Sequence, residues 1–214
     1  RRQLVSDVPL GTFLSGGLDS SIISAVAASH FRSLGHQLDT FSVTYTDNQK
    51  YFKTSKFQPT TDEPYIQMMA EFLGSNHHTF VVDNEQLALA LKAAVDARDL
   101  PGMADVDSSL LLFCEEIKKH VTVALSGECA DEIFGGYPWY RDEKIRSAYG
   151  FPWAQTTAMR QKFLTPHLRK LIDGEAEVSA RYEQALAETD KSEGLSPKES
   201  RLREMVHLNM YWFM

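Results

Sequence analysis

Short apolar runs alternate with longer amphipathic segments over the first 125 residues of the chain. Runs rich in aliphatic, β-branched and aromatic residues predict four strands, at Leu10–Leu14, Thr40–Tyr45, His77–Val82 and Val121–Leu125. The segments after them carry apolar residues at helical spacing and predict helices over about residues 18–31, 61–73, 84–95 and 105–117. This alternation is typical of an α/β fold with a doubly wound, mostly parallel sheet and flanking helices.

The first predicted helix has one side made of small and apolar residues, which are Leu18, Ile22, Ala25, Val26 and Ser29. A helix buries its apolar side against the core. We therefore expect this side to lie on the sheet.

From residue 138 the pattern changes to clustered aromatic residues followed by helical segments alone. We therefore predict an α/β domain at residues 1–137 and an incomplete helical extension or lid at residues 138–214. The chain opens without methionine and closes on an aromatic, Met-rich run, and exposed apolar ends are disfavoured. We expect a piece of a longer protein.

The charge balance limits the partners of the chain. There are 22 basic and 29 acidic residues, a net charge of −7, and no basic block, so nucleic acid and anionic membranes are not expected as partners. No apolar run has the length of a membrane span, and no signal-peptide pattern opens the chain. The two cysteines, Cys114 and Cys129, form no CxxC pair, which fits a reducing cytoplasm.

A glycine turn joins the first predicted strand to the first helix, with the sequence Ser15-Gly16-Gly17-Leu18-Asp19-Ser20. A strand, a tight turn and a helix start direct backbone N–H groups toward an anion, and serine hydroxyls add donors. The alternative is a short loop whose polar residues only cap the helix.

A second Ser-Gly turn follows the fourth predicted strand. It begins at Ser126-Gly127-Glu128-Cys129-Ala130-Asp131 and continues to Gly135-Gly136-Tyr137. Parallel sheets bind ligands beyond the carboxyl ends of their strands, so the two turns can converge on one ligand. The polar segment at 47–60, either a functional flap or poorly ordered, and residues 103–109 would border an adjoining pocket.

The residue types favour a nucleotide held by its pyrophosphate. No lysine follows the glycines, so the turn is not a Walker A loop. Asp19 and Asp131 supply hard oxygen ligands suited to Mg²⁺. Such a site would serve attack on the α-phosphorus of ATP with pyrophosphate leaving, which is adenylation and not phosphoryl transfer.

Both motifs resemble those of one family. Ser15 to Ser20 resembles the SGGxDS signature of the N-type ATP pyrophosphatases, also called PP-loop enzymes, and residues 126–137 resemble the second signature of glutamine-dependent asparagine synthetases. The resemblance implies that the aspartate carboxylate attacks ATP to form a β-aspartyl-adenylate. Ammonia from a separate N-terminal glutaminase domain then displaces AMP. A homodimer is compatible with the resemblance.

The resemblance also assigns roles to matching positions. Leu14 and Val43 would flank the adenine, and Ser126 and Gly127 would lie near the nucleoside. Glu128 would help to deprotonate ammonia, or it would be a helix-terminal carboxylate without a catalytic role. Asp131 would contact the Mg²⁺–pyrophosphate. The pyrophosphate itself would be held by Ser15, Gly16, Gly17, Asp19 and Ser20.

One position departs from the resemblance, and two other functions stay open. Cys129 stands where many members have glycine, and a positive φ there would cost about 1–2 kcal/mol. One alternative is a related adenylating amidotransferase or a β-lactam synthetase-like cyclase that acts on another carboxylate. The other is a nucleotide-binding module without catalysis. The glutaminase domain and a family lysine lie outside these residues, so this piece alone is expected to be impaired.

Overall fold

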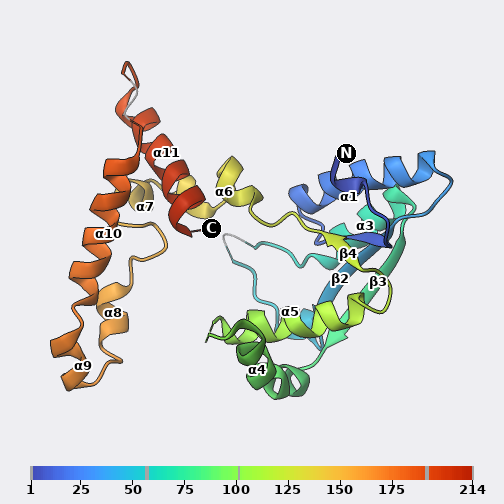
Figure 1. Ribbon diagram of the computed structural model, residues 1–214, viewed down its shortest axis with the longest axis horizontal. Helices are drawn as coiled ribbons and strands as arrows, with labels where there is room; N and C mark the ends of the chain where they lie inside the picture. The colour runs from blue at the N-terminus through green and yellow to red at the C-terminus, as the bar shows by residue number, and fades with distance from the viewer. Residues whose placement is uncertain (1, 56–57, 101, 191–192, 214) are drawn as a thin grey trace. The chain divides into compact units, whose positions relative to one another are not determined.

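A four-stranded parallel sheet organises the first half of the chain. The computed structural model describes residues 2–55, 58–100, 102–190 and 193–213. The strands are β1 (Leu10–Phe13), β2 (Asp39–Tyr45), β3 (Asn76–Val82) and β4 (Val123–Leu125), in the order β3-β2-β1-β4 (Figure 1). All three pairings are parallel. The α/β class and the four predicted strands are confirmed.

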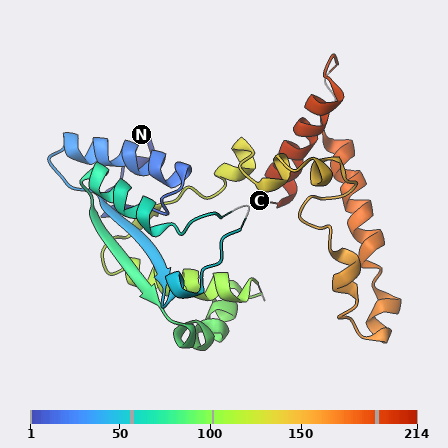
Figure 2. The same ribbon diagram turned by 180° about the vertical axis from the view of Figure 1, so that it is seen from behind.

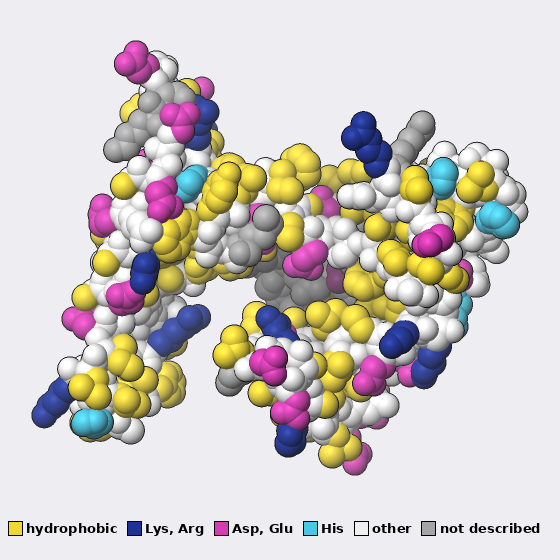
Figure 3. Space-filling view, in the orientation of Figure 1, with side chains coloured by type: hydrophobic (Ala, Val, Ile, Leu, Met, Phe, Trp, Pro, Cys, Tyr) yellow, Lys and Arg dark blue, Asp and Glu magenta, His cyan; other side chains and the backbone are white. Residues whose placement is uncertain are grey.

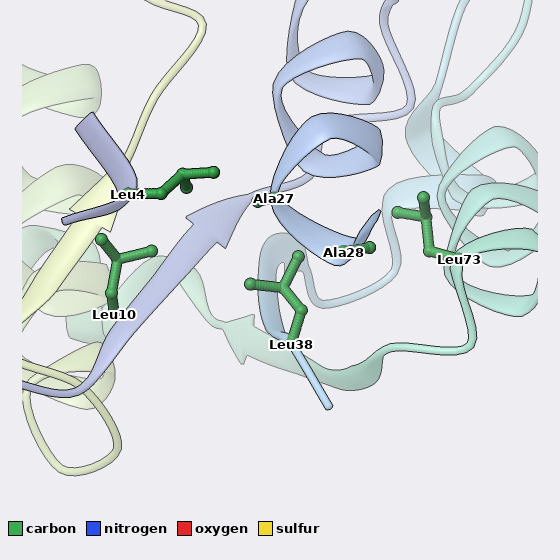
Figure 4. Packing of buried hydrophobic residues seen from close by; sticks show 6 residues of the cluster. All are labelled: Leu4, Leu10, Ala27, Ala28, Leu38 and Leu73. Atoms are coloured by element: carbon green, nitrogen blue, oxygen red, sulfur yellow. The ribbon is translucent and has the colours of Figure 1, made fainter. Parts of the chain in front are cut away.

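Helices cover both faces of the sheet. On one face, α1 (Leu18–Ser33) and α3 (Glu63–Leu73) place Ala27, Ala28 and Leu73 over Leu10 and Leu38, with Leu4 of the short turn η1 (Arg2–Leu4) at the edge (Figure 4). On the other face, Phe113 and Ile117 of α5 (Ala104–Ile117) pack against Phe41, and α4 (Asn84–Arg98) lies beside α5 (Figure 2). This is the doubly wound arrangement that the alternation predicts.

The expectation for the sheet-facing side of α1 is wrong. Leu18, Ile22 and Val26 are 74%, 54% and 42% exposed, and Ser29 is exposed as well. Of the expected side, only Ala25 packs against the core. The buried side consists of the smaller residues Ser20, Ser24, Ala27 and Ala28. Small side chains allow the helix to approach closely, and the hydroxyl groups of Thr12 in β1 and Ser24 share a hydrogen bond of 2.8 Å.

The chain forms two compact units, Arg1–Gly127 and Glu128–Met214. The predicted domain boundary after residue 137 is not tested by this division and stays a prediction. The segment at 47–60 contains a short helix, α2 (Asn48–Tyr51), while residues 56–57 lie outside the described residues.

The described part of the second unit is helical, as predicted for the C-terminal part. Its core contains Phe151, Tyr182, Ala185 and Leu208, with the indole of Trp153 packed against them. The elements are α6 (Ala130–Phe134), η2 (Pro138–Tyr140), α7 (Glu143–Ser147), α8 (Thr157–Gln161), α9 (Pro166–Leu171), α10 (Gly174–Glu188), α11 (Pro197–Leu208) and the π-helical turn η3 (Asn209–Phe213).

Candidate nucleotide-binding site

The glycine turn between β1 and α1 is held by its own serines. The Ser15 backbone N–H donates to Ser20 Oγ over 3.1 Å, and the two hydroxyl groups lie 2.9 Å apart. Ser20 Oγ also lies 3.2 Å from the carbonyl oxygen of Gly17, to which it donates. These bonds fix a turn that opens directly into the first turn of α1, as an anion-binding loop requires.

Gly16 is required where the turn meets α3. Its φ is +76°, a conformation that L side chains rarely adopt. A Cβ at this position would lie 2.8 Å from the Cβ of Tyr65 and 2.9 Å from the backbone nitrogen of Ile66. The first turn of α3 therefore packs directly on the glycine turn.

Gly127, near the start of the second motif, lies against the first motif. A Cβ on Gly127 would lie 3.1 Å from the Cβ of Asp19 and 3.1 Å from the backbone nitrogen of Ser20. The end of β4 thus lies against the start of α1, because β4 pairs with β1 in parallel register. The structure brings together Ser15 to Ser20 and Gly127, all within the first unit.

Of the two residues expected to flank an adenine, Leu14 directly follows β1 and Val43 lies in the neighbouring strand β2. Leu14 is 1% exposed, and its N–H donates to the Phe41 carbonyl over 2.8 Å. Val43 in β2 is half-buried against the cluster that contains Phe41 and Phe113. The burial of both residues follows from their positions in the sheet. Their contact with an adenine stays a prediction.

The second motif folds around a short helix with a left-handed residue at each end. Cys129 is the N-cap of α6 with φ +70°, and Gly135 is the C-cap, also with φ +70°. The N–H groups of Gly135 and Gly136 both donate to the Asp131 carbonyl, over 3.0 and 3.2 Å. The φ of +70° at Cys129 meets the condition under which a cysteine at this position costs about 1–2 kcal/mol. Glu128 and Asp131 belong to the second unit, and their roles stay predictions.

The motif also contains a buried acid–phenol pair that the sequence reasoning did not single out. The Tyr137 hydroxyl donates to the Glu132 carboxylate over 2.6 Å, and Glu132 is 5% exposed. Burial, this hydrogen bond and the other carboxylates of the motif raise the pKa of Tyr137 above its ordinary value. The ring of Trp139 stacks on Tyr137 at 4.2 Å. The sequence offers no signal for this pair, because it does not specify the direction that the chain takes at Gly135 and Gly136.

Glu63 is a second residue that the sequence reasoning missed. Its Oε1 accepts hydrogen bonds from Thr44 Oγ1 over 2.9 Å and from Asn48 Nδ2 over 2.8 Å. The bond from Asn48 is the main reason why the pKa of Glu63 falls to about 2. The ionised carboxylate therefore fastens α2 and the end of β2 to the start of α3.

The segment at 103–109 reaches the carboxyl end of β2 through Ser109, and the expectation that it borders a pocket stays a prediction. The hydroxyl groups of Tyr45 and Ser109 lie 2.7 Å apart. Buried Asp107 pairs with Arg98, which joins α5 to α4.

The predicted Mg²⁺ ligands are not part of a ready-made metal-binding cluster in the described residues. Within residues 2–55, 58–100, 102–190 and 193–213, no three His, Cys, Asp or Glu side chains form a group that could hold a metal ion. Asp19 and Asp131, the predicted Mg²⁺ ligands, belong to different units. The prediction that they hold Mg²⁺ stays untested.

A parallel α/β sheet with a glycine turn after β1 and a second turn after β4 has its candidate ligand site at the carboxyl ends of the strands. The asparagine synthase family matches residues 1–214, the whole chain. The chain belongs to the asparagine synthase family.

Curated relatives agree with this family. The chain is 52% identical to glutamine-hydrolysing asparagine synthetase 3 of Bacillus subtilis over 214 residues, all of this chain but 34% of that protein. It is 42% identical to asparagine synthetase 1 of the same organism over 64% of the chain and 20% of the relative. It is 32% identical to asparagine synthetase 2 of Arabidopsis thaliana over 65% of the chain and 24% of the relative. The chain therefore spans about a third or less of the length of these relatives.

Within the described residues, no helix combines the length and the apolar character that crossing a membrane requires.

Proposed function

We propose that the full-length protein containing this chain makes asparagine from aspartate, ATP and glutamine-derived ammonia. The observation that carries the proposal is the contact of Gly127 with Asp19 and Ser20. It brings Gly127, near the start of the second motif, against the first motif within the first unit, and family membership supplies the class of reaction.

The first step is adenylation. An oxygen of the aspartate β-carboxylate attacks the α-phosphorus of ATP, the bond to the β-phosphate oxygen breaks, and pyrophosphate leaves. The Ser15–Ser20 turn supports this step because its N–H groups and hydroxyl groups suit the leaving pyrophosphate. Bound Mg²⁺ would neutralise charge on the pyrophosphate, and Asp19 and Asp131 are the residues that we assign to it.

The second step forms the amide. Ammonia attacks the acyl carbon of the β-aspartyl-adenylate, the C–O bond breaks, and AMP leaves. The attacking nitrogen must lose a proton, and we assign Glu128 to accept it. The ammonia comes from glutamine hydrolysis in another part of the full-length protein, as the names of the relatives indicate for those proteins.

Two features of the turn suit ATP: its glycines leave room for the phosphates, and its serines supply hydrogen-bond donors. A Cβ on Gly16 would collide with the start of α3, and a Cβ on Gly127 would press on Asp19 and Ser20 of the turn. We assign Leu14, which directly follows β1, and Val43 in β2 to the apolar contact with the adenine. The chain's own residues thus supply a cradle of glycines, hydroxyl groups and a carboxylate.

Pyrophosphate–ATP exchange by the full-length protein, with and without aspartate, tests the proposal. Exchange that depends on aspartate is expected. Exchange without aspartate, or with a different carboxylic acid only, would indicate the related amidotransferase or cyclase. No exchange with any acid, together with retained ATP binding, would indicate a nucleotide-binding module.

A further inference from the structure

The helix α6, which follows Glu128 and carries Asp131, is too short to hold its position alone. It contains five residues, Ala130–Phe134, and its N-cap Cys129 and its C-cap Gly135 both have a left-handed conformation. Isolated helices shorter than about 12 residues are marginal in water, so contacts outside α6 must fix it. The orientation of Glu128 and Asp131 therefore depends on those contacts.

The first of these contacts is a close approach of the Gly136 backbone. A Cβ on Gly136 would overlap with the Asp131 carboxylate. The N–H groups of Gly135 and Gly136 both donate to the Asp131 carbonyl, over 3.0 and 3.2 Å. The chain after α6 thus folds back over Asp131 and brings the next residue, Tyr137, toward the helix.

The second contact is the hydrogen bond from Tyr137 to the middle of α6. The Tyr137 hydroxyl donates to Oε1 of Glu132 over 2.6 Å, and Glu132 is 5% exposed. This length is typical of an O–H group that donates to an ionised carboxylate, a bond about twice as strong as one between neutral groups. One strong bond at a buried acceptor therefore holds α6.

Tyr137 is itself fixed by aromatic residues of the second unit. Its ring stacks on that of Trp139, with centroids 4.2 Å apart, and packs edge-to-face with Phe213 at 5.3 Å. The Phe213 ring lies 4.8 Å from that of Trp153, which packs against the buried core of this unit. On the face shown in Figure 3, hydrophobic side chains gather over α6 and beside α11. The bond to Glu132 therefore connects α6 with a packed aromatic cluster.

We propose that Tyr137 and Glu132 are positioning residues, whose hydrogen bond holds Glu128 and Asp131 in the orientation that the proposed reaction requires. Neither of the two is assigned to touch the substrate, and both act through α6. Burial, and after it Glu132, Asp131 and Glu128, raise the pKa of the Tyr137 hydroxyl, so the carboxylates of the motif lie near it. The inference rests on the proposed function, because Glu128 and Asp131 receive their roles there.

The kinetics of asparagine formation by the full-length protein, with ammonia as the nitrogen source, test the inference. Tyr137→Phe removes a hydrogen bond to a charged group and should lower kcat about tenfold or more. The KM for ATP should stay within about threefold, because the Ser15–Ser20 turn lies in the first unit and is unchanged. Glu132→Gln keeps an acceptor for the same hydroxyl and should retain at least about a third of the wild-type kcat.

Tyr149→Phe is the matched control. The Tyr149 hydroxyl also donates to a glutamate, at Oε1 of Glu183, over 2.6 Å in the same unit. This bond joins residues outside the motif that the proposed reaction does not use. Its loss should leave kcat unchanged.

A double variant separates positioning from stability. Tyr137→Phe alone leaves a buried carboxylate without its donor, which also lowers the free energy of unfolding. Tyr137→Phe combined with Glu132→Leu leaves neither polar partner of the bond in place. It should restore the wild-type midpoint of chemical denaturation, while kcat stays as low as in Tyr137→Phe.

Four results would each overturn the inference. They are a Tyr137→Phe enzyme with wild-type kcat, a Glu132→Gln enzyme as slow as Tyr137→Phe, a Tyr149→Phe enzyme that is equally slow, and a double variant that regains activity together with stability. Each leaves the proposed function standing when the wild type shows aspartate-dependent exchange of pyrophosphate with ATP. A wild type without that exchange overturns the proposed function and this inference with it.

Discussion

Replacing Gly16 by alanine tests the packing of α3 on the glycine turn. The φ of +76° costs an L residue about 1–2 kcal/mol. The new Cβ would also lie 2.8 Å from the Tyr65 Cβ and 2.9 Å from the Ile66 nitrogen. These atoms belong to or adjoin the backbone and cannot rotate away, so overpacking adds about 1–3 kcal/mol. We expect a total loss of about 2–5 kcal/mol in local stability.

Gly35→Ala is the matched control for this perturbation. Gly35 has φ +77°, and a Cβ there would meet no atom within 4 Å. The control therefore carries the backbone strain alone, about 1–2 kcal/mol. The difference between the two variants isolates the contact with α3.

Amide hydrogen exchange in the full-length protein measures both losses, because it reports the free energy of local opening in α1 and α3. ATP binding measured by calorimetry should weaken in Gly16→Ala and stay near wild type in Gly35→Ala. If Gly16→Ala costs no more than Gly35→Ala in either measurement, the packing of α3 on the turn does not shape the site.

Three further predictions concern single residues. Cys129→Gly should raise the free energy of unfolding by up to about 1–2 kcal/mol, because φ is +70° there; an unchanged or lower value in chemical denaturation would contradict the strain. Burial, and secondly Glu132, raise the pKa of Tyr140 to about 12, so the folded state favours the protonated phenol; its contribution is present below about pH 10 and is lost toward pH 12. The melting temperature of wild type should therefore fall more steeply than that of Tyr140→Phe over this range, and parallel curves would refute the shift. The pKa of Glu63 is lowered to about 2, so its contribution is present above its ordinary value of 4.5 and is lost as the pH falls toward 2; Glu63→Gln should flatten the acid limb of the stability curve, and an unchanged limb would count against the assignment.

The sheet was predictable because the residues of each strand favour strand structure locally and are also the ones that the folded sheet buries. The strands are apolar or β-branched runs, and glycine or polar residues mark most of their ends. The glycine turn was predictable for the same reason, since a strand, two glycines and a helix start allow few other conformations. The resemblance, in which many members have glycine at position 129, raised a positive φ at Cys129 only as a condition, and the folded chain has φ +70° there.

The side of α1 that faces the sheet was not predictable from hydrophobicity. Ser20 and Ser24 are buried because the helix lies close to β1 and shares a hydrogen bond with Thr12. The larger residues Leu18 and Ile22 point away from the sheet. Close packing of these small side chains against β1 decides which side of α1 is buried, although burying the larger apolar side chains would remove more apolar surface from water. The periodicity of the sequence alone does not reveal this outcome.

The polar contacts of the site were also not predictable from spacing. Glu63 reaches Thr44 and Asn48, which lie 19 and 15 residues earlier in the chain. The bond from Tyr137 to Glu132 forms because the chain turns back at Gly135 and Gly136, and the sequence does not specify the direction of that turn. Both contacts arise from the arrangement of whole elements, which appears only in the folded chain.

The most direct test of the central claim follows one oxygen atom. The full-length protein is supplied with ATP, ammonia and aspartate labelled with oxygen-18 in its β-carboxylate, and the products are analysed by mass spectrometry. If the carboxylate attacks the α-phosphorus, one labelled oxygen leaves with AMP when ammonia displaces it. Label that appears in inorganic phosphate, or AMP that carries none while asparagine forms, would contradict adenylation at this site.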